Sequence, residues 1–441
     1  MRLSYANWKE QNYMSGKKVL LITGIPVRTD TNTGKTLQTL FADFGSDELA
    51  QIYFSPQSPN TNMCSAYYRL CEKQMIKSLF GLRKGCGGEV SPVCEGENAV
   101  KPEKNALLLT RHRGNILMKL SREVVWSLSA WKNKNLKNWL RKVKPDVIFT
   151  ILHDTNSAAK AVKWISDFTG APVVLFVTDD YYNDQEKSKN LLRKIYYRKR
   201  QRLNKKLAEN VVSLVGCSEK ATEYFMSELN IKSGQTIYTP SAETYLAMPY
   251  KEQTDGGIVK IRYFGNLGLG RWEMLKLLGQ TISTINADKK RALLEIYSSV
   301  TDPEIIGQLN IENACEYKGW VYGDEYLKLL QDADIAVHVE SFEASMIRRT
   351  WVSVSTKIAD YLGAGKCILA IGSSELASID HIKDAACVVN DMALLKDTLE
   401  KLVSDAKMRS DFQIKAKKLA AEQHNMARIS AQVRTLIEEN T

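Results

Sequence analysis

Two segments in the second half of the chain combine glycine, hydroxyl and basic residues in an order that suits a phosphorylated ligand. The first, residues 263–271 (YFGNLGLGR), follows an apolar run that predicts a strand. Glycines let the backbone approach a ligand closely, N–H groups at a helix start attract anions, and Arg271 adds a fixed positive charge. The glycine spacing does not match the GxGxxG dinucleotide fingerprint. We therefore expect a diphosphate site here, the alternative being a structural turn between a strand and a helix.

The second segment, residues 355–366 (STKIADYLGAGK), predicts a short helix followed by a buried strand. Ser355 and Thr356 stand near its N-cap and Lys357 in its first turn, which makes another anion-binding helix end. Asp360 would face the same ligand if the apolar residues of this helix face the core. The alternative is an ordinary capped helix that packs on its sheet.

In the first half of the chain, a polar segment follows the first predicted strand. Residues 28–36 end in Gly34-Lys-Thr, but Thr29 stands where a nucleotide-binding P-loop has glycine. What remains is a loop that leads into a helix start. Such a loop is a natural place for a phosphate or carboxylate, although it could equally be a polar turn.

Two later strands of this half also end in residues that could do chemistry. Ligands of open α/β sheets bind beyond the carboxyl ends of the strands. His153 follows one strand and is the histidine best placed to face a cleft. Asp179 and Asp180 follow the next. Because the two acids are contiguous, they lack the spacing of a DxD metal site, and we expect them to position a substrate or to cap a helix.

Apolar runs that alternate with helical patterns predict the elements that hold these residues. Runs of this kind suit strands buried on both faces of a parallel sheet. They predict two successive doubly wound α/β domains, 1–245 and 246–441, joined by a linker at 238–257. The last helix could pack back on the N-terminal domain. Residues 81–104, rich in glycine and proline, are expected to form an inserted loop. The predicted strands are 18–24, 48–54, 147–152, 172–178 and 211–217, then 259–264, 292–297, 335–339, 367–371 and 386–389.

Residues 355–372, the loop at 263–271 and the spacing between them resemble the retaining group 1 glycosyltransferases, a GT-B family. The resemblance covers residues 259–374 well, and elsewhere only the TDDYY segment at 178–182. It implies two Rossmann-like domains that face a central cleft. The C-terminal one would bind a nucleotide-diphosphate sugar, UDP- or GDP-linked, and the N-terminal one the acceptor.

The resemblance also implies roles for individual residues. Many members have two glutamates eight residues apart beside the donor. Here Asp360 matches the second, Val352 falls on the first, and Glu343 is expected to take the place of that first acid. The donor-binding residues would be Gly265, Asn266, Arg271, Ser355, Thr356, Lys357 and Tyr361, the catalytic residues His153, Asp360 and Glu343, and the acceptor-side residues Gly34, Asp179 and Asp180.

The resemblance implies a glycosyltransferase whose acceptor is polar, either a glycan or a lipid-linked molecule. Arg271 and Lys357 would neutralise the diphosphate leaving group, so no cofactor and no metal are expected. Two alternatives stay open. One is a nucleotide-sugar epimerase, which would act on the donor alone. The other is a non-catalytic glycan-binding or scaffold protein, for which the valine at position 352 is the main argument.

Net charge indicates anionic partners. The 441 residues carry a formal net charge of +11, and residues 191–207 hold eight Lys or Arg with Leu192, Ile195, Tyr196, Leu203 and Leu207 near one helical face. A basic amphipathic helix is typical of an anionic membrane surface, although its apolar side could instead pack on its own sheet. No nucleic-acid module is recognised. Without a signal peptide or a long apolar run, we expect a cytoplasmic protein or one peripheral at the inner face of the plasma membrane.

Overall fold

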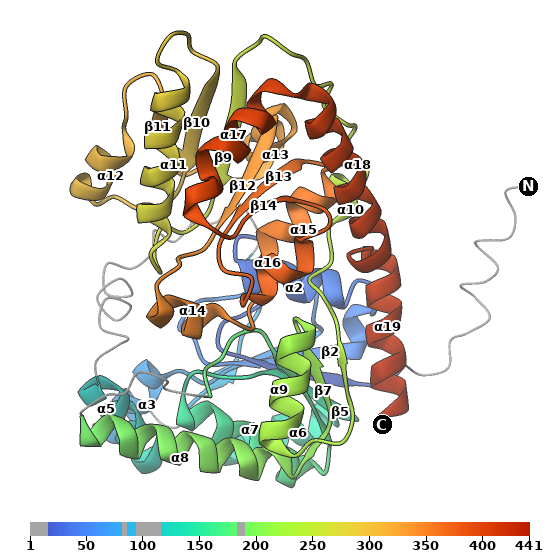
Figure 1. The fold of residues 1–441 in the computed structure, drawn as a ribbon. Coiled ribbons are helices and arrows are strands. Elements are labelled where there is room, and N and C mark those ends of the chain that lie inside the picture. The colour runs from blue at the N-terminus through green and yellow to red at the C-terminus, as the bar shows by residue number, and fades with distance from the viewer. Residues whose placement is uncertain (1–15, 82–85, 94–115, 183–189) are drawn as a thin grey trace, which may run out of the picture.

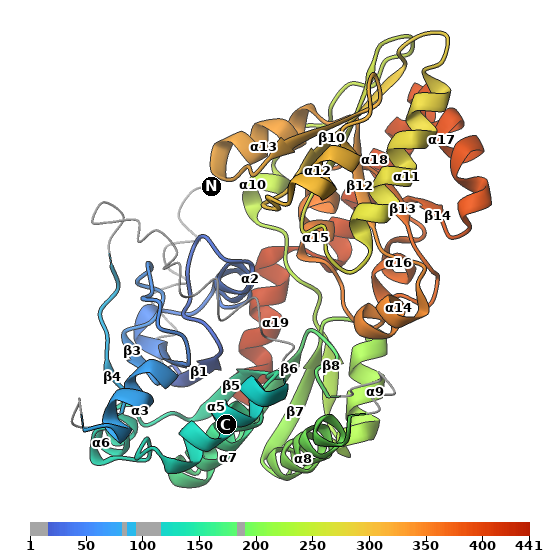
Figure 2. The same cartoon turned by 90° about the vertical axis from the view of Figure 1, so that its left-hand side faces the viewer.

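The computed structural model describes residues 16–81, 86–93, 116–182 and 190–441. Most of the loop expected at 81–104 lies outside these residues. The described chain forms two α/β domains, one above the other in Figure 1, and Figure 2 shows the same two domains from the side. The predicted architecture of two parallel sheets is confirmed.

The N-terminal sheet has the strand order β4-β3-β2-β1-β5-β6-β7-β8, and all its pairs are parallel except β3 with β4. Its central strands are buried on both faces, which is why they appear in the sequence as unbroken apolar runs. The strands are β1 Val19–Thr23, β2 Leu49–Tyr53, β3 Ala66–Arg69, β4 Gly88–Glu89, β5 Val147–Ile151, β6 Val173–Val177, β7 Val211–Gly216 and β8 Gly234–Thr236. The helices are α2 Asn32–Leu40, α3 Glu72–Leu79, α5 Ile116–Leu128, α6 Lys134–Val143, α7 Asn156–Thr169, α8 Leu191–Ala208 and α9 Glu219–Leu229, with the 3-10 turn η1 Ser46–Glu48.

The C-terminal sheet has the strand order β11-β10-β9-β12-β13-β14 and is parallel throughout. The edge strand β11 was not predicted, because its alternating residues are only partly buried. The strands are β9 Val259–Phe264, β10 Ala292–Tyr297, β11 Cys315–Gly319, β12 Ile335–Val339, β13 Cys367–Ile371 and β14 Cys387–Val389. The helices are α10 Glu243–Leu246, α11 Arg271–Ile285, α12 Pro303–Leu309, α13 Gly323–Asp332, α14 Ala344–Thr350, α15 Thr356–Gly363, α16 Ala377–Ile382, α17 Leu395–Ser404 and α18 Ala406–Gln423, with η2 Met392–Leu394.

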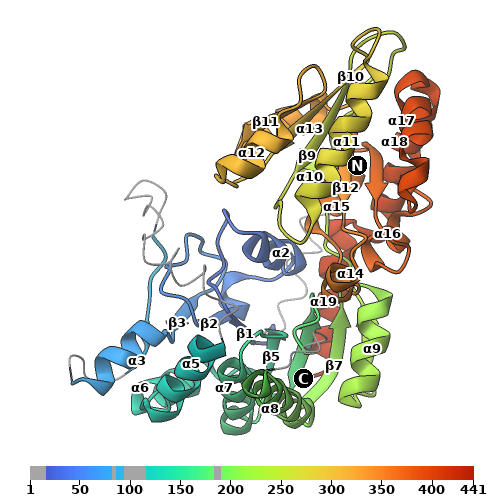
Figure 3. The same ribbon diagram turned by 60° about the vertical axis from the view of Figure 1, so that its left-hand side comes forward.

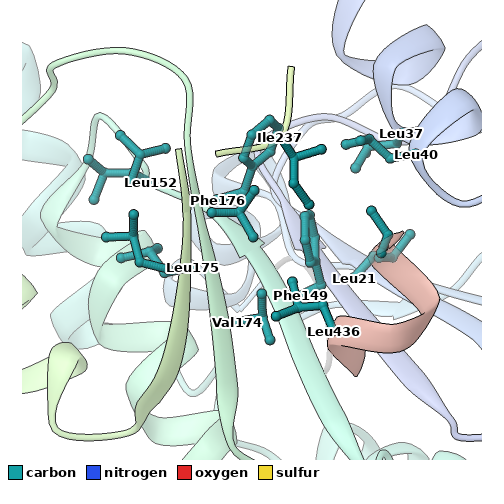
Figure 4. Packing of buried hydrophobic residues seen from close by; sticks show 14 of the residues in the cluster. Leu21, Leu37, Leu40, Phe149, Leu152, Val174, Leu175, Phe176, Ile237 and Leu436 are labelled. Atoms are coloured by element: carbon teal, nitrogen blue, oxygen red, sulfur yellow. The ribbon is translucent and has the colours of Figure 1, made fainter. Parts of the chain in front are cut away.

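The last helix, α19 Met426–Glu439, leaves the C-terminal domain and packs against α2 of the N-terminal domain. It contributes Ile429, Val433, Leu436 and Ile437 to the N-terminal core. Figure 4 shows Leu436 in the same cluster as Phe149 of β5. The two domains therefore share one hydrophobic cluster.

Two stretches of chain cross between the domains side by side. The backbone N–H of Ser241 donates to the carbonyl of His424 at 2.8 Å. The fully buried imidazole of His424 lies 2.7 Å (Nδ1) from the carbonyl oxygen of Thr239 and 2.8 Å (Nε2) from Nε2 of His381. We call this double crossing, with Thr239, Ser241, His381 and His424, the hinge. Burial lowers the pKa of His424 to about 4 and also lowers that of His381, so both histidines are neutral at pH 7.

Helix α8 carries the basic segment and packs on its own domain, against α7. Tyr196 and Leu207 of the predicted apolar face are buried, but Leu192 and Ile195 are exposed. Arg200 and Asn204 are buried on the same side as Tyr196 and Leu207. The apolar face predicted for residues 191–207 is therefore used in two ways, one part packing on the domain and the other remaining exposed.

Candidate functional site

The turn between β9 and α11 positions the first candidate anion site. As predicted, α11 begins at Arg271. Gly270 has a φ of +77°, and a Cβ there would lie 2.6 Å from the hydroxyl oxygen of Ser341. Only glycine allows this close approach of the two loops. Asn266 shapes the same turn, because its Oδ1 accepts a 2.6 Å hydrogen bond from the N–H of Gly268. Gly265 opens the turn directly after β9.

Arg271 is held by a buried glutamate that the sequence analysis did not select. Its Nη2 lies 2.7 Å from Oε1 of Glu340, and its Nε lies 3.1 Å from Oε2. The Glu340 side chain is 6% exposed and that of Arg271 is 19% exposed. Burial raises the pKa of Glu340, against the lowering influence of Arg271. A two-point pair fixes the guanidinium plane at the start of α11.

The second candidate anion site is the start of α15. Ser355 caps this helix, since its Oγ accepts from the N–H of Lys357 at 3.4 Å, and Thr356 is the first helical residue. The Lys357 ammonium lies 3.2 Å from Oδ2 of Asp360 and 3.9 Å from the centre of the Tyr326 ring. The Tyr326 hydroxyl donates to the same Asp360 oxygen at 3.0 Å. A cation at a helix start is thus surrounded by an acid and an aromatic face.

Tyr361 does not reach this surface. Its side chain is 1% exposed and belongs to the core cluster with Ile358 and Leu362. The spacing of these three residues puts them on the inner face of α15, so the prediction that Tyr361 contacts the ligand is not supported by its position. The same spacing leaves Asp360 partly exposed, as expected.

Glu343 and Val352 have different surroundings. Glu343 is exposed at the N-cap of α14, where its carboxylate accepts a short hydrogen bond from the Ser345 hydroxyl. Val352 is fully buried in the core of the N-terminal domain, and its carbonyl accepts from the hydroxyl of Ser218 at 2.7 Å. An ionised side chain at position 352 would lose its water shell there, so the missing acid has a structural reason.

On the N-terminal sheet, the ends of β5 and β6 bring His153 and the two acids to neighbouring strands. His153 Nε2 lies 3.3 Å from the Thr150 hydroxyl oxygen, and its ring packs edge-on against Phe54 at 5.6 Å between centroids. Burial lowers the pKa of His153 to about 4, partly offset by Asp154. His153 is therefore neutral at pH 7 and can accept a hydrogen bond.

Asp179 and Asp180 contact the C-terminal domain. Asp179 Oδ1 accepts from the hydroxyl of Ser353 at 2.8 Å, and Asp180 Oδ2 accepts from Nε1 of Trp351 at 3.3 Å. The pKa of the Arg271 guanidinium is raised. Burial, the largest influence, lowers this pKa, whereas the negative charges of Glu340 and, more weakly, of Asp179 raise it. The two sheets therefore meet at their carboxyl edges, with the start of α15 between them.

Gly34 occupies a buried position in the first turn of α2. Its N–H donates to the Thr31 hydroxyl at 3.2 Å, and a Cβ there would lie 2.0 Å from the carbonyl oxygen of Arg28. The glycine is thus required by the tight entry into the helix. This start of α2 follows β1, the strand beside β5.

Sequence reasoning missed several residues of the C-terminal edge. Glu340 is the first residue after β12, a position that could have identified it. Trp320 and Tyr322 follow β11 and are 60% and 75% exposed. Flat aromatic faces at this edge suit stacking on a planar ring. Within the described ranges, no three His, Cys, Asp or Glu side chains cluster as metal ligands would.

Residues 283–435 match a protein-family model described as glycosyl transferase-like. This segment contains Glu340, the start of α15 and the hinge histidines. No curated protein is significantly similar to the chain in sequence.

Solved structures with the same fold cover nearly the whole chain. HepE from Anabaena, solved in complex with UDP, matches with a TM-score of 0.57 and 12% identity over 96% of this chain and 100% of its own. The UDP-forming α,α-trehalose-phosphate synthase of Burkholderia xenovorans, solved with glucose-6-phosphate, matches with a TM-score of 0.60 and 10% identity over 96% of this chain and 100% of its own. Sucrose-phosphate synthase from Thermosynechococcus elongatus matches with a TM-score of 0.60 and 11% identity over 96% of this chain and 99% of its own.

These comparisons confirm two predictions. The chain has the GT-B fold, and its C-terminal part resembles the glycosyltransferases as the sequence indicated. At identities of 8 to 12% the solved structures establish the fold and not the reaction.

Proposed function

We propose that the protein is a GT-B glycosyltransferase that moves a sugar from a nucleoside-diphosphate sugar to a polar acceptor. The observation that carries this proposal is the Arg271–Glu340 pair at the start of α11. It holds a cation and free helix N–H groups at the carboxyl edge of the C-terminal sheet, on a fold in which HepE was solved with UDP.

The reaction needs positive charge at the leaving group. Cleavage of the glycosyl–phosphate bond develops negative charge on the diphosphate and positive charge on the sugar ring. Arg271 and Lys357 would stabilise the diphosphate, assisted by Ser355 and Thr356 at the start of α15. Because both cations are already oriented by neighbouring acids, little reorganisation is required when the ligand binds.

The acids would act on the sugar and the acceptor. Asp360 and Glu343 would position the ring or its hydroxyl groups, and retention of configuration is proposed from the family resemblance. On the N-terminal side, neutral His153 would accept a hydrogen bond from the acceptor or donor sugar. Asp179, Asp180 and the start of α2 at Gly34 would bind acceptor hydroxyls.

Among donors we favour a UDP-sugar, because HepE was solved with UDP and with UDP and glucose, and a trehalose-phosphate synthase neighbour is described as UDP-forming. The acceptor would be a glycan or a lipid-linked molecule of polysaccharide biosynthesis. The basic helix α8, residues 191–207 in the sequence prediction, would contact an anionic membrane surface.

A non-catalytic role loses its main argument in the structure. That argument was the valine at position 352, whose burial where the two domains meet gives its apolar character a packing reason. An epimerase would act on the donor alone and would give no transfer product.

The test is a thermal-shift screen against UDP, GDP, ADP, CDP and their common sugar conjugates. A ligand at about a hundred times its dissociation constant stabilises the folded state by about 2.7 kcal/mol. We expect a clear shift with UDP and its sugars that is lost in Arg271→Ala. Equal melting temperatures with every nucleotide would contradict the proposal. Transfer from the donor identified, rather than its isomerisation, would separate the transferase from an epimerase.

A further inference from the structure

Three helices of the N-terminal domain form an outer surface with an unusual composition. Helix α5 contacts both α3 and α8. Figures 1 and 3 place α5 and α8 along the side of this domain that faces away from the C-terminal domain. In the part of the chain that the structure describes, no helix has both the length and the apolarity to span a membrane. Any contact of this surface with a bilayer would thus be peripheral.

Helix α5 presents an apolar stripe to the surface. Leu117, Ser121, Val124 and Leu128 are spaced four, three and four residues apart, so they share one helical face. The three apolar members are 64%, 55% and 68% exposed in that order. The stripe contains no charged residue, although α5 is an outer helix of its domain.

The neighbouring helices extend this stripe. Nine of the nineteen large apolar side chains that are exposed in the described chain lie on α3, on the residue directly after it, on α5 or on α8. Exposed apolar side chains gathered on helices that contact one another suit an interaction site. Besides the three residues of the α5 stripe, these nine are Ile76, Leu79 and Phe80 on and directly after α3, and Leu191, Leu192 and Ile195 at the start of α8.

The same helices carry almost all the net charge of the chain. They contain twelve Lys or Arg and two Glu, so they account for ten of its eleven net positive charges. Both glutamates are in ion pairs. Glu72 lies 2.7 Å from Nε of Arg122, and the buried Glu123 lies 3.1 Å from Lys160 and 3.2 Å from Lys199. The exposed cations are therefore not balanced by acids on these helices.

A hollow of about 550 Å³ between α5, α7 and α8 adds to this charge. Its walls include Trp131, which is only 6% exposed, and Trp164. Around it lie Lys132, Lys206 and Lys163, the last paired with Asp167 at 2.8 Å. Lys132 lies over both rings, at 5.2 and 5.5 Å from their centroids. Indole rings beside ammonium groups suit the boundary between water and lipid.

One buried arginine connects this surface with the proposed acceptor side. Arg200 of α8, 2% exposed, donates from Nη1 to the carbonyl of Tyr181 at 2.8 Å and from Nη2 to the carbonyl of Asp154. These two residues follow Asp180 and His153 in the chain. The position of α8 therefore fixes the loops that end β5 and β6.

We propose that the outer face formed by α3, α5 and the exposed side of α8 docks on an anionic lipid bilayer. The α5 stripe enters the boundary between headgroups and acyl chains, and the α8 cations lie over the lipid phosphates. Apolar area and cationic charge act together in such binding, as in interfacial amphipathic helices. The inference rests on the membrane contact in the proposed function and extends its apolar part from α8 to α5 and α3.

The test is co-sedimentation of the full chain with vesicles of phosphatidylglycerol and phosphatidylcholine, and with phosphatidylcholine alone. We expect binding to the anionic vesicles, weakening as salt is raised, and little binding to the neutral ones. Replacing Leu117, Val124 and Leu128 with Ser should weaken binding by about tenfold or more. Replacing Arg198, Arg202 and Lys205 with Gln should weaken binding and reduce its dependence on salt.

Matched variants on the C-terminal domain provide the controls. Ile258, Leu394 and Ile414 are 50%, 51% and 58% exposed, and their change to Ser should leave vesicle binding unaltered. Lys289, Lys407 and Lys418, exposed on the same domain, are the controls for charge.

Three outcomes would overturn the docking proposal. The α5 variant could bind vesicles as the parent does, or the apolar control could lose as much binding. In the third, light scattering without vesicles would show a dimer that the α5 variant abolishes, so that a second copy covers the face. The melting-temperature shift with UDP is measured separately on each variant. If the parent chain does not bind anionic vesicles but keeps its UDP shift, the docking proposal alone is contradicted. If the parent binds vesicles but shows no UDP shift, the donor site alone is contradicted.

Discussion

The carboxyl edges of the two sheets use charged side chains in opposite ways. The C-terminal edge presents two cations, Arg271 and Lys357, each held by an acid and each at a helix start. The N-terminal edge presents two acids, Asp179 and Asp180, which accept hydrogen bonds from the opposite domain. The first arrangement suits the anion that we propose binds there, and the second joins the two domains next to it.

The comparison also shows that loops with similar sequences at the two edges have different neighbours. Both edges consist of polar residues after buried strands, as their sequences indicated. At the N-terminal edge these residues contact Trp351 and Ser353, which immediately precede α15. The contact between the domains is therefore adjacent to the candidate anion site at the start of α15, and a change in one is expected to affect the other.

The largest effect should come from breaking the contact between the domains. Val352→Glu would bury an unpaired carboxylate in the N-terminal core and lower the free energy of unfolding by about 3–5 kcal/mol. Chemical denaturation measures the loss. The matched variant Val212→Glu, at a position 38% exposed on β7, should cost far less. Equal losses of unfolding free energy in the two variants would show that the burial of Val352 does not contribute to the contact between the domains.

Removing the Arg271 cation from the C-terminal edge should produce the next largest effect. Arg271→Ala is expected to lower kcat/KM by about 10²–10³-fold, because a preorganised charge at the leaving group is lost. Steady-state kinetics with the identified donor would measure it. Arg291→Ala, at the opposite end of the same sheet before β10, is the control. Unchanged kinetics in Arg271→Ala would mean that this edge does not bind the diphosphate.

The hinge between the domains should respond to pH. The folded pKa of His424, about 4, lies below the unfolded value of about 6.5, so the unfolded chain takes up the proton first as the pH falls. The stabilising contribution is complete above pH 6.5 and is lost as the pH falls toward 4, at about 1 kcal/mol per pH unit. His424→Gln should therefore flatten the fall in unfolding free energy between pH 7 and 5. If the unfolding free energy of the parent and of the variant fell equally between pH 7 and 5, this prediction would be contradicted.

The smallest effect should come from neutralising one acid of the N-terminal edge. Asp179→Asn can still accept the hydrogen bond from Ser353, so stability should change by less than about 1 kcal/mol. If Asp179 also binds acceptor hydroxyls, the acceptor KM should rise about tenfold while the melting-temperature shift with UDP is kept. A fall in stability with an unchanged acceptor KM would make Asp179 a residue of the domain contact only.

Patterns between near neighbours in the chain predicted much of the fold and part of the site. Unbroken apolar runs gave the central strands, and the glycines before Arg271 and the hydroxyl residues before Lys357 marked two helix starts that the structure confirms. Strands β3, β4, β8 and β11 were missed, because short or partly exposed strands at or near a sheet edge lack the continuous burial that makes such runs.

What the sequence alone determined was therefore local: the two α/β sheets, the turns after their strands and the large positive charge. Tertiary structure decided which residues meet. Glu340 pairs with Arg271 across 69 positions and Asp180 with Trp351 across 171. It also buried Tyr361 and Val352 and left the α5 stripe exposed. The physical reason is that a residue's periodicity fixes its helical face or strand side, whereas its partner and its burial depend on how distant elements pack.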